Sequence, residues 1–215
     1  MHSVTPLIEE IERTIAEAIK YFNLSTKPEQ IVVTVQSHGT RRNALGWFAG
    51  ERWQNGTKGA SASHEINITA EFLKRDDDRG GVAETILHEL AHAENKTLKI
   101  ADTDKSGRVH NKKFKEMAER LGLSVDGRDP RIGFSFTRLN DSGKDFLKKC
   151  AFKRELFKLY RVNPLVEKKD GTRMIKCECA SCGYVVRTTK KWLEKGNPFC
   201  PCGTEMKPQE QEDVE

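Results

Sequence analysis

One helical segment restricts this chain more than any other part of its sequence. Apolar residues recur at helical spacing from Val82 to about Leu98, and the segment contains the run His88-Glu89-Leu90-Ala91-His92. Side chains four positions apart project from one face of a helix, so both imidazoles can reach a single Zn²⁺ ion. Glu89 lies about 100° round the helix from His88, near enough to act on a water at the metal without ligating it. The segment therefore predicts a zinc-binding helix that carries a catalytic glutamate.

A third zinc ligand is expected outside this helix, because a catalytic zinc generally has three protein ligands and one open position. The extended metzincin pattern requires Gly at position 95 and His at position 98. This chain has Asn95 and Leu98 instead. The sequence therefore excludes that class of protease.

Four residues remain as candidates for the third ligand. Glu116 and Glu119 have the spacing of a carboxylate ligand on a later helix, and His64 stands at one end of a predicted strand. His110 is favoured, because it opens the next predicted helix after a loop long enough to bring the chain back beside the first two ligands.

The other periodic segments predict helices combined with a small sheet. Helical spacing from Leu7 to Phe22 follows Pro6, a residue that suits the first turn of a helix. Short β-branched, aromatic or alternating runs predict strands over residues 31–35, 46–50 and 64–68. Further helices are expected over residues 114–121 and from Asp141 to about Tyr160. We expect an α+β fold in which a helix and small-sheet domain is followed by a small cysteine-bearing module.

Five of the six cysteines crowd between Cys177 and Cys202, where close pairs are typical of metal ligands. The first pair is Cys179 with Cys182 and the second is Cys200 with Cys202, each followed by glycine. Four thiolates from two such turns predict a structural zinc site in a zinc ribbon. Cys177 is then an unligated fifth thiol, or it replaces Cys179 in a changed register.

The basic residues gather in the C-terminal third. Residues 143–207 carry 16 Lys and Arg against 7 Asp and Glu, whereas residues 1–142 carry 21 of each. Such a surface favours a polyanionic partner, of which nucleic acid is the commonest, although a solvated charged surface is the alternative. Within the cysteine module, one aromatic residue stands among cations that could contact DNA: Arg187, Lys190, Lys191 and Trp192. The alternative is that Tyr184 and Trp192 only form the ribbon's small core.

The composition divides the chain into four segments. Polar residues from Asn163 to Gly171 mark a boundary between modules. We expect a domain with the histidine motif over residues 1–140, a basic helix and linker over 141–171, the zinc ribbon over 172–207 and an acidic disordered tail over 208–215.

No run approaches the roughly 18 apolar residues that a membrane helix requires. The beginning of the chain lacks a basic segment followed by an apolar stretch, so no secretory signal is expected. These features predict a cytoplasmic protein without a membrane partner, associated with DNA or the nucleoid if the basic third binds nucleic acid.

Three stretches of the sequence together resemble the SprT-like (Spartan-type) zinc metalloproteases. They are the run from His88 to His92, residues 107–114 with His110 and Phe114, and residues 118–123. The resemblance covers most of the chain, including a zinc ribbon after the catalytic region. It implies a zincin-like domain in which His88, His92 and His110 bind zinc and Glu89 is catalytic. Asn111 departs from the glycine that many relatives have after the third histidine.

The leading hypothesis is a zinc endopeptidase with one catalytic and one structural Zn²⁺. The resemblance implies a role linked to DNA, so its protein substrates would be associated with or crosslinked to DNA. One alternative is a nucleic-acid-binding regulatory protein whose zinc sites are both structural. Another is a zinc hydrolase that acts on something other than protein.

Overall fold

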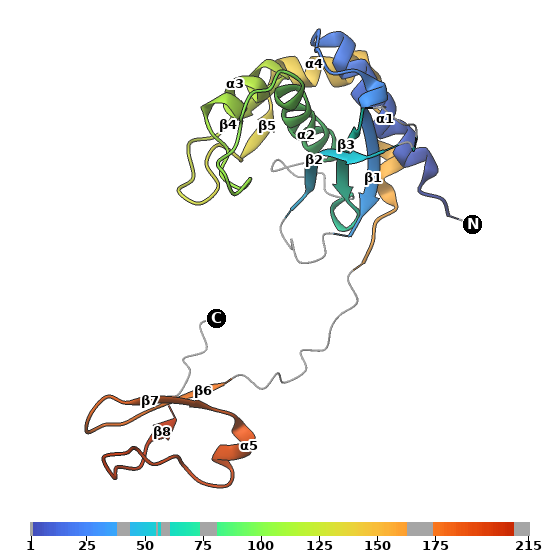
Figure 1. The fold of residues 1–215 in the computed structure, drawn as a ribbon. Helices are drawn as coiled ribbons and strands as arrows, with labels where there is room; N and C mark the ends of the chain where they lie inside the picture. The colour runs from blue at the N-terminus through green and yellow to red at the C-terminus, as the bar shows by residue number, and fades with distance from the viewer. Residues whose placement is uncertain are drawn as a thin grey trace. The chain divides into compact units, whose positions relative to one another are not determined.

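A computed structural model describes residues 2–37, 44–54, 56, 61–73, 81–162 and 174–208. The chain divides into two compact units, Met1–Val162 and Asn163–Glu215, which are described one by one below (Figure 1). The predicted linker over 163–171 and most of the predicted acidic tail lie outside the described residues. Helices and strands are mixed along the chain, as the sequence predicts. Among the described residues, no helix is both long enough and apolar enough to cross a bilayer.

Helix α2 (Val82–Thr97) occupies the centre of the first unit. Figure 1 shows the three-stranded sheet and α1 (Thr5–Tyr21) on one side of α2. On its other side lie α3 (Lys112–Arg120) and the strand pair β4 (Leu123–Val125) and β5 (Thr137–Leu139). Most residues of α2 are buried, because the helix has neighbours on several sides. Its apolar side chains join those of α1 and the sheet in one core, which contains Ile11, Ile15, Ile66, Leu87 and Leu90.

The sheet has the strand order β1-β3-β2, so β3 (Ser63–Thr69) lies in the middle. It pairs in parallel with β1 (Ile31–Gln36) and antiparallel with β2 (Gly46–Trp53). The sequence predicts that this strand alternates between polar and apolar faces, but every residue from His64 to Thr69 is buried. Each polar residue there makes at least one side-chain hydrogen bond, although the amide nitrogen of Asn67 has no partner among the described residues. For example, Glu65 accepts bonds from the indole nitrogens of Trp47 and Trp53 at 3.2 and 2.8 Å.

The basic segment after residue 140 packs onto the first unit. Helix α4 (Asp141–Lys149) is followed by a short 3₁₀ helix, η3 (Arg154–Lys158), rather than by the continuous helix that the sequence predicts. Phe146 and Phe157 from these two elements belong to the same core as α1 and α2. Residues 141–162 therefore lie with the first unit, whereas the sequence sets them apart from it. Two further 3₁₀ helices, η1 (Pro28–Gln30) and η2 (Ala70–Phe72), flank the sheet strands in sequence.

Within residues 174–208, the second unit contains three short antiparallel strands and one helical turn. Strand β6 (Ile175–Glu178) lies between β7 (Val185–Thr188) and β8 (Lys207–Pro208), and α5 (Lys190–Leu193) follows β7. Its core is small, consisting of Cys177, Cys179, Cys200 and Met206 with Val186 and Leu193 packed against them.

Candidate metal centres

Three imidazoles converge on one point in the first unit. His88 and His92 come from successive turns of α2, and His110 comes from the segment before α3. One nitrogen from each ring lies within 4.8 Å of the others, and the Nε2 atoms of His92 and His110 are 3.0 Å apart. The structure thus brings together the three residues that the sequence favours as zinc ligands.

His110 precedes α3 and does not open it as the sequence predicts. The helix begins at Lys112, where the side chain of Asn111 caps the backbone N–H groups of Lys113 and Phe114. His110 itself is held in an extended segment, because its N–H donates to Ile132 and its carbonyl accepts from Phe134, both at 3.0 Å. This segment sets the position of the third imidazole.

Gly133 allows that segment to approach closely. A Cβ atom at this position would lie only 2.0 Å from the carbonyl oxygen of His110, and the residue has a φ of +69°. Both the close approach and the positive φ disfavour any residue other than glycine at this position.

Each imidazole is also bonded at its second nitrogen. His92 Nδ1 lies 2.7 Å from Asp102 Oδ2, His110 Nδ1 lies 3.3 Å from the carbonyl oxygen of Ile132, and His88 Nδ1 lies 3.2 Å from Thr137 Oγ1. Thr137 donates its hydroxyl proton to Glu84, so it accepts from His88. All three partners are therefore acceptors, which places the ring proton on Nδ1 and leaves the Nε2 lone pair for a metal ion.

The three rings rest on Phe114, which is fully buried. Ring centroids of His88, His92 and His110 lie 4.6, 4.6 and 4.4 Å from that of Phe114. Phe48 of β2 adds a second apolar wall, stacked on His92 at 6.3 Å. The cluster therefore has an apolar floor that restricts how the imidazoles can turn.

Burial keeps two of the imidazoles neutral. It lowers the pKa of His88 well below the usual value, and the neighbouring histidines lower it further. Burial and the charge of His92 also lower the pKa of His110, to about 4. Neutral imidazole is the form that binds metal ions, so these residues are in the ligating state near pH 7.

Glu89 follows His88 on α2, and its side chain is directed at β2, an edge strand of the sheet. A Cβ atom at Gly46 would be 3.3 Å from Glu89 Oε1 and 2.7 Å from the carbonyl oxygen of Asn67. Glycine at this position therefore lets the backbone of β2 approach the carboxylate. Glu89 itself is 6% exposed.

The other candidate ligands lie elsewhere. His64 Nδ1 accepts the backbone N–H of Glu51 at 3.0 Å, and its ring lies tilted against Phe48, with the centroids 5.5 Å apart. Glu116 and Glu119 form ion pairs on α3 with Lys113 and Lys115. None of the three joins the histidine cluster in the part of the chain that the structure describes.

The chemistry of this donor set fits a zinc ion. Zinc prefers imidazole nitrogen, and three neutral histidines are one of its usual ligand sets at catalytic sites. The three nitrogens converge, each with its tautomer fixed by a second partner. From the sequence, Phe114 is identified only as a residue of a helix and of the family resemblance, and those partners, Gly46 and Gly133 are missed. Of these, only Asp102, a carboxylate between the second and third histidines, left a weak signal.

Four cysteines form a second cluster in the other unit. The Sγ atoms of Cys179 and Cys202 are 3.5 Å apart, and those of Cys182 and Cys200 are 3.4 Å apart. All four sulfurs lie within 4.8 Å of one another, a donor set compatible with a tetrahedral structural zinc. Cys177 is fully buried in the small core beside this cluster and is not one of its members.

The predicted nucleic-acid contacts lie at the surface of the second unit. Arg187 is on β7, and Lys190, Lys191 and Trp192 are on α5; all four are exposed. Trp192 is 58% exposed and Tyr184 is 50% exposed, so neither forms the core of the ribbon. The ring of Trp192 is covered on one side by Lys195, whose Nζ lies 5.3 Å from its centroid.

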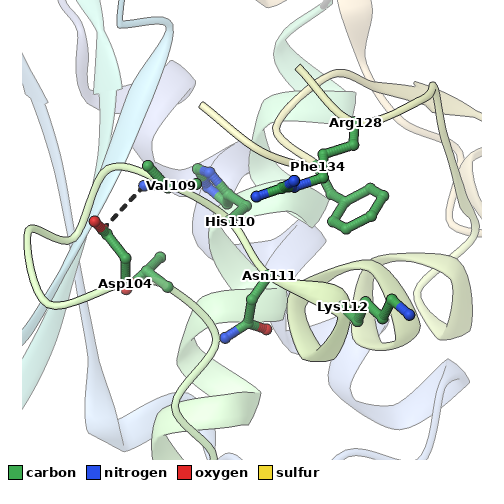
Figure 2. A pocket seen from close by; sticks show the side chains of 8 residues that line it. Asp104, Val109, His110, Asn111, Lys112, Arg128 and Phe134 are labelled. Atoms are coloured by element: carbon green, nitrogen blue, oxygen red, sulfur yellow. Dashed lines mark hydrogen bonds between the residues drawn. The ribbon is translucent and has the colours of Figure 1, made fainter. Parts of the chain in front are cut away.

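A pocket of about 430 Å³ lies beside His110. Figure 2 shows Arg128 pointing toward His110, with Phe134 and Val109 among the residues that line the space. The pocket therefore shares one of its walls with the histidine cluster.

A family model described as the SprT-like family matches residues 11–135, more than half of the chain. The match includes all three histidines and Glu89. No curated protein and no solved structure matches the chain.

Proposed function

Because the chain belongs to the SprT-like family, we propose that it is a zinc-dependent endopeptidase with a zincin-like catalytic domain. The observation that carries this proposal is the position of Glu89 next to the three clustered histidines. Three imidazoles converge on one point, and the carboxylate of Glu89, the residue after His88, faces the edge strand β2.

His88, His92 and His110 would hold the ion. A bound Zn²⁺ supplies Lewis-acid chemistry, which makes water nucleophilic near neutral pH and polarises a peptide carbonyl. Asp102, Thr137 and the carbonyl of Ile132 fix the imidazole orientations through Nδ1. Phe114 and Phe48 keep one side of the site apolar.

Glu89 would act as the general base and then as the general acid. Its carboxylate takes a proton from the attacking water, and the same oxygen returns the proton to the amine that leaves when the peptide bond breaks. Strand β2 would orient the substrate, because in the described part of the chain it pairs on one side only. An extended substrate segment added to this edge would run past Glu89 through main-chain hydrogen bonds.

Substitution of Glu89 by Gln tests the catalytic role. The variant should bind two zinc ions per chain and keep its fold, while cleavage of a denatured or DNA-bound protein falls by at least about 100-fold. Glu116→Gln is the matched control, since Glu116 is exposed and pairs only with Lys113 in the described structure. It should cleave as the wild type does.

The basic third of the chain supports an association with DNA. We propose that Arg187, Lys190, Lys191 and Trp192 contact nucleic acid and bring the protease to DNA-associated or DNA-crosslinked proteins, in the cytoplasm or nucleoid. Support comes from the charge of residues 143–207 and from the exposure of Trp192. Changing the three cations to Gln should weaken DNA binding. It should also reduce the slope of log affinity against log salt concentration by about two to three.

One result would favour the alternative function. If the wild type and Glu89→Gln are equally inert while DNA binding still depends on the three cations, the chain is a nucleic-acid-binding regulator. Cleavage of a small ester or amide without cleavage of protein would point instead to another class of zinc hydrolase.

A further inference from the structure

The pocket beside His110 is not used by the catalytic steps described above. It is an open pocket lined by the loop before α3 and by the segment that precedes β5. Its volume of about 430 Å³ is within the range of pockets that bind small groups, and is ample for one amino-acid side chain. Because His110 forms part of its wall, whatever enters the pocket lies next to the metal ligands.

The pocket is lined by uncompensated positive charge. Arg128 is exposed, points toward His110 in Figure 2, and forms no ion pair within the described parts of the chain. Lys112, at the start of α3, is a second exposed cation in the lining. The Arg128 guanidinium offers several parallel N–H donors, a geometry that matches a carboxylate.

The one acid in the lining does not neutralise Arg128. Asp104 accepts hydrogen bonds at Oδ1 from the backbone N–H groups of Arg108 and Val109, both at 3.1 Å. The hydroxyl of Ser106 also donates to its carboxylate. Figure 2 shows the carboxylate turned to the N–H of Val109, on the far side of His110 from Arg128. Asp104 therefore holds the loop in place, and the Arg128 side of the pocket keeps its charge.

Apolar groups complete the pocket. Phe134 and Val109 are half-buried and line the same space as Arg128. A fitting occupant has an apolar stem and an anionic tip, as a glutamate side chain has. A DNA phosphate fits less well, because it has no apolar part to contact Phe134 and Val109.

We propose that this pocket binds an acidic side chain of the protein substrate, at a residue close to the peptide bond that is cleaved. Arg128 pairs with the substrate carboxylate, and Phe134 and Val109 contact its methylene groups. This proposal rests on the proposed protease function, since it takes its substrate from that function. The pocket would add to that function a preference for substrates with an acidic residue near the cleaved bond.

The test uses full-length zinc-loaded protein and peptides that differ at one position. Each peptide carries Glu, Gln or Lys at that position, and the position is moved stepwise along an otherwise uniform sequence. Binding is measured with the Glu89→Gln variant, in which the peptide is not consumed, and cleavage is measured with the wild type. Arg128→Glu is introduced into both backgrounds. Lys148→Glu on α4 is the control, because it makes the same reversal of charge at an exposed residue outside the pocket.

At one position, the Glu peptide should bind about fivefold more tightly than the Gln peptide, as expected for a partly exposed charge pair. Arg128→Glu should reverse this preference in favour of Lys, and Lys148→Glu should leave it unchanged. Equal binding of the three peptides at every position, or a preference that survives Arg128→Glu, would overturn the proposal. So would an Arg128→Glu protein that loses affinity only for an oligonucleotide.

The two proposals fail in different ways. If the wild type cleaves none of the peptides although binding depends on Arg128 and on Glu, the pocket assignment stands and the protease assignment falls. If the wild type cleaves all of them without regard to charge, the protease stands and the pocket assignment falls.

Discussion

His92 Nδ1 lies 2.7 Å from Asp102 Oδ2, and the same carboxylate oxygen accepts from Asn95 at 3.2 Å. This carboxylate orients the imidazole and makes its other nitrogen a better donor to metal. Asp102→Ala should therefore lower zinc affinity at the histidine site by about 10- to 100-fold. Competition with a chromophoric chelator measures the affinity. Asp145→Ala, at an exposed position of α4, is the control, and equal affinities in the two variants would show that Asp102 does not support the site.

Gly133 gives a second test of how the third histidine is positioned. Gly133→Ala should destabilise the first unit by about 2 kcal/mol, because the residue has positive φ and its Cβ would meet the carbonyl of His110. Urea denaturation measures the loss, and zinc affinity should fall with it. Gly127→Ala is the matched control from the same stretch of chain, since nothing lies within 4 Å of a Cβ there. Similar stabilities for the two variants would contradict the prediction.

Some of these residues could be selected from sequence and others could not. One helical period fixes how His88, Glu89 and His92 project, so their spacing alone indicates a shared site. Asp102 and Thr137 act from a loop and from a three-residue strand, and neither has a periodic pattern. Their contacts depend on tertiary structure, which local sequence does not encode.

Helix α1 is joined to the end of α4 by a partly buried charged pair, Glu10 and Arg13. Glu10 is 3% exposed, and its carboxylate accepts from Arg13 at 2.6 Å and from the backbone N–H of Lys153 at 2.8 Å. Arg13 in turn donates to the carbonyl oxygen of Cys150 at 2.7 Å. Burial opposes ionisation of Glu10, but the hydrogen bonds outweigh it and hold the pKa of Glu10 below its usual value.

The lowered pKa of Glu10 predicts how the stabilisation by this contact between α1 and the end of α4 changes as the pH falls. A carboxyl group whose pKa is lower in the folded state stabilises the fold above its unfolded pKa of about 4.3, and this contribution is lost as pH falls through the folded pKa. Glu10→Gln should therefore lower the free energy of unfolding by about 2 kcal/mol near pH 7 and by progressively less below about pH 4. Urea denaturation over a pH series measures the difference. The exposed Glu12→Gln is the control, and a difference for Glu10→Gln that does not change with pH would contradict this account.

The same contacts explain why one predicted helix is shorter than its pattern. Apolar spacing continues to Tyr160, yet α4 ends at Lys149 and Ala151 has a φ of +49°. The carbonyl groups of Cys150 and Ala151 accept from Arg13, a residue more than 130 positions earlier. Helix α2, by contrast, was predicted within about one residue of its observed ends, because its own buried face fixes its length.

The two units differ in what holds them together. The first buries a continuous apolar core from several helices and strands, whereas the described core of the second contains three cysteines and one methionine with two apolar neighbours. A segment this small buries too little apolar surface to offset its conformational entropy. Metal binding at the four cysteines should therefore supply most of the folding free energy of the second unit.

Removal of metal should consequently unfold the second unit and leave the first folded. With a strong chelator, amide signals of residues 174–208 should collapse into the unfolded range of an NMR spectrum, while those of α1 and α2 remain dispersed. Cys179→Ser should produce the same collapse without chelator, because it removes one of the four clustered thiols. Cys177→Ala is the matched control on β6, since that thiol is buried beside the cluster but outside it. It should keep one zinc in the second unit, so loss of zinc from Cys177→Ala together with its retention in Cys179→Ser would show that Cys177 ligates the metal instead.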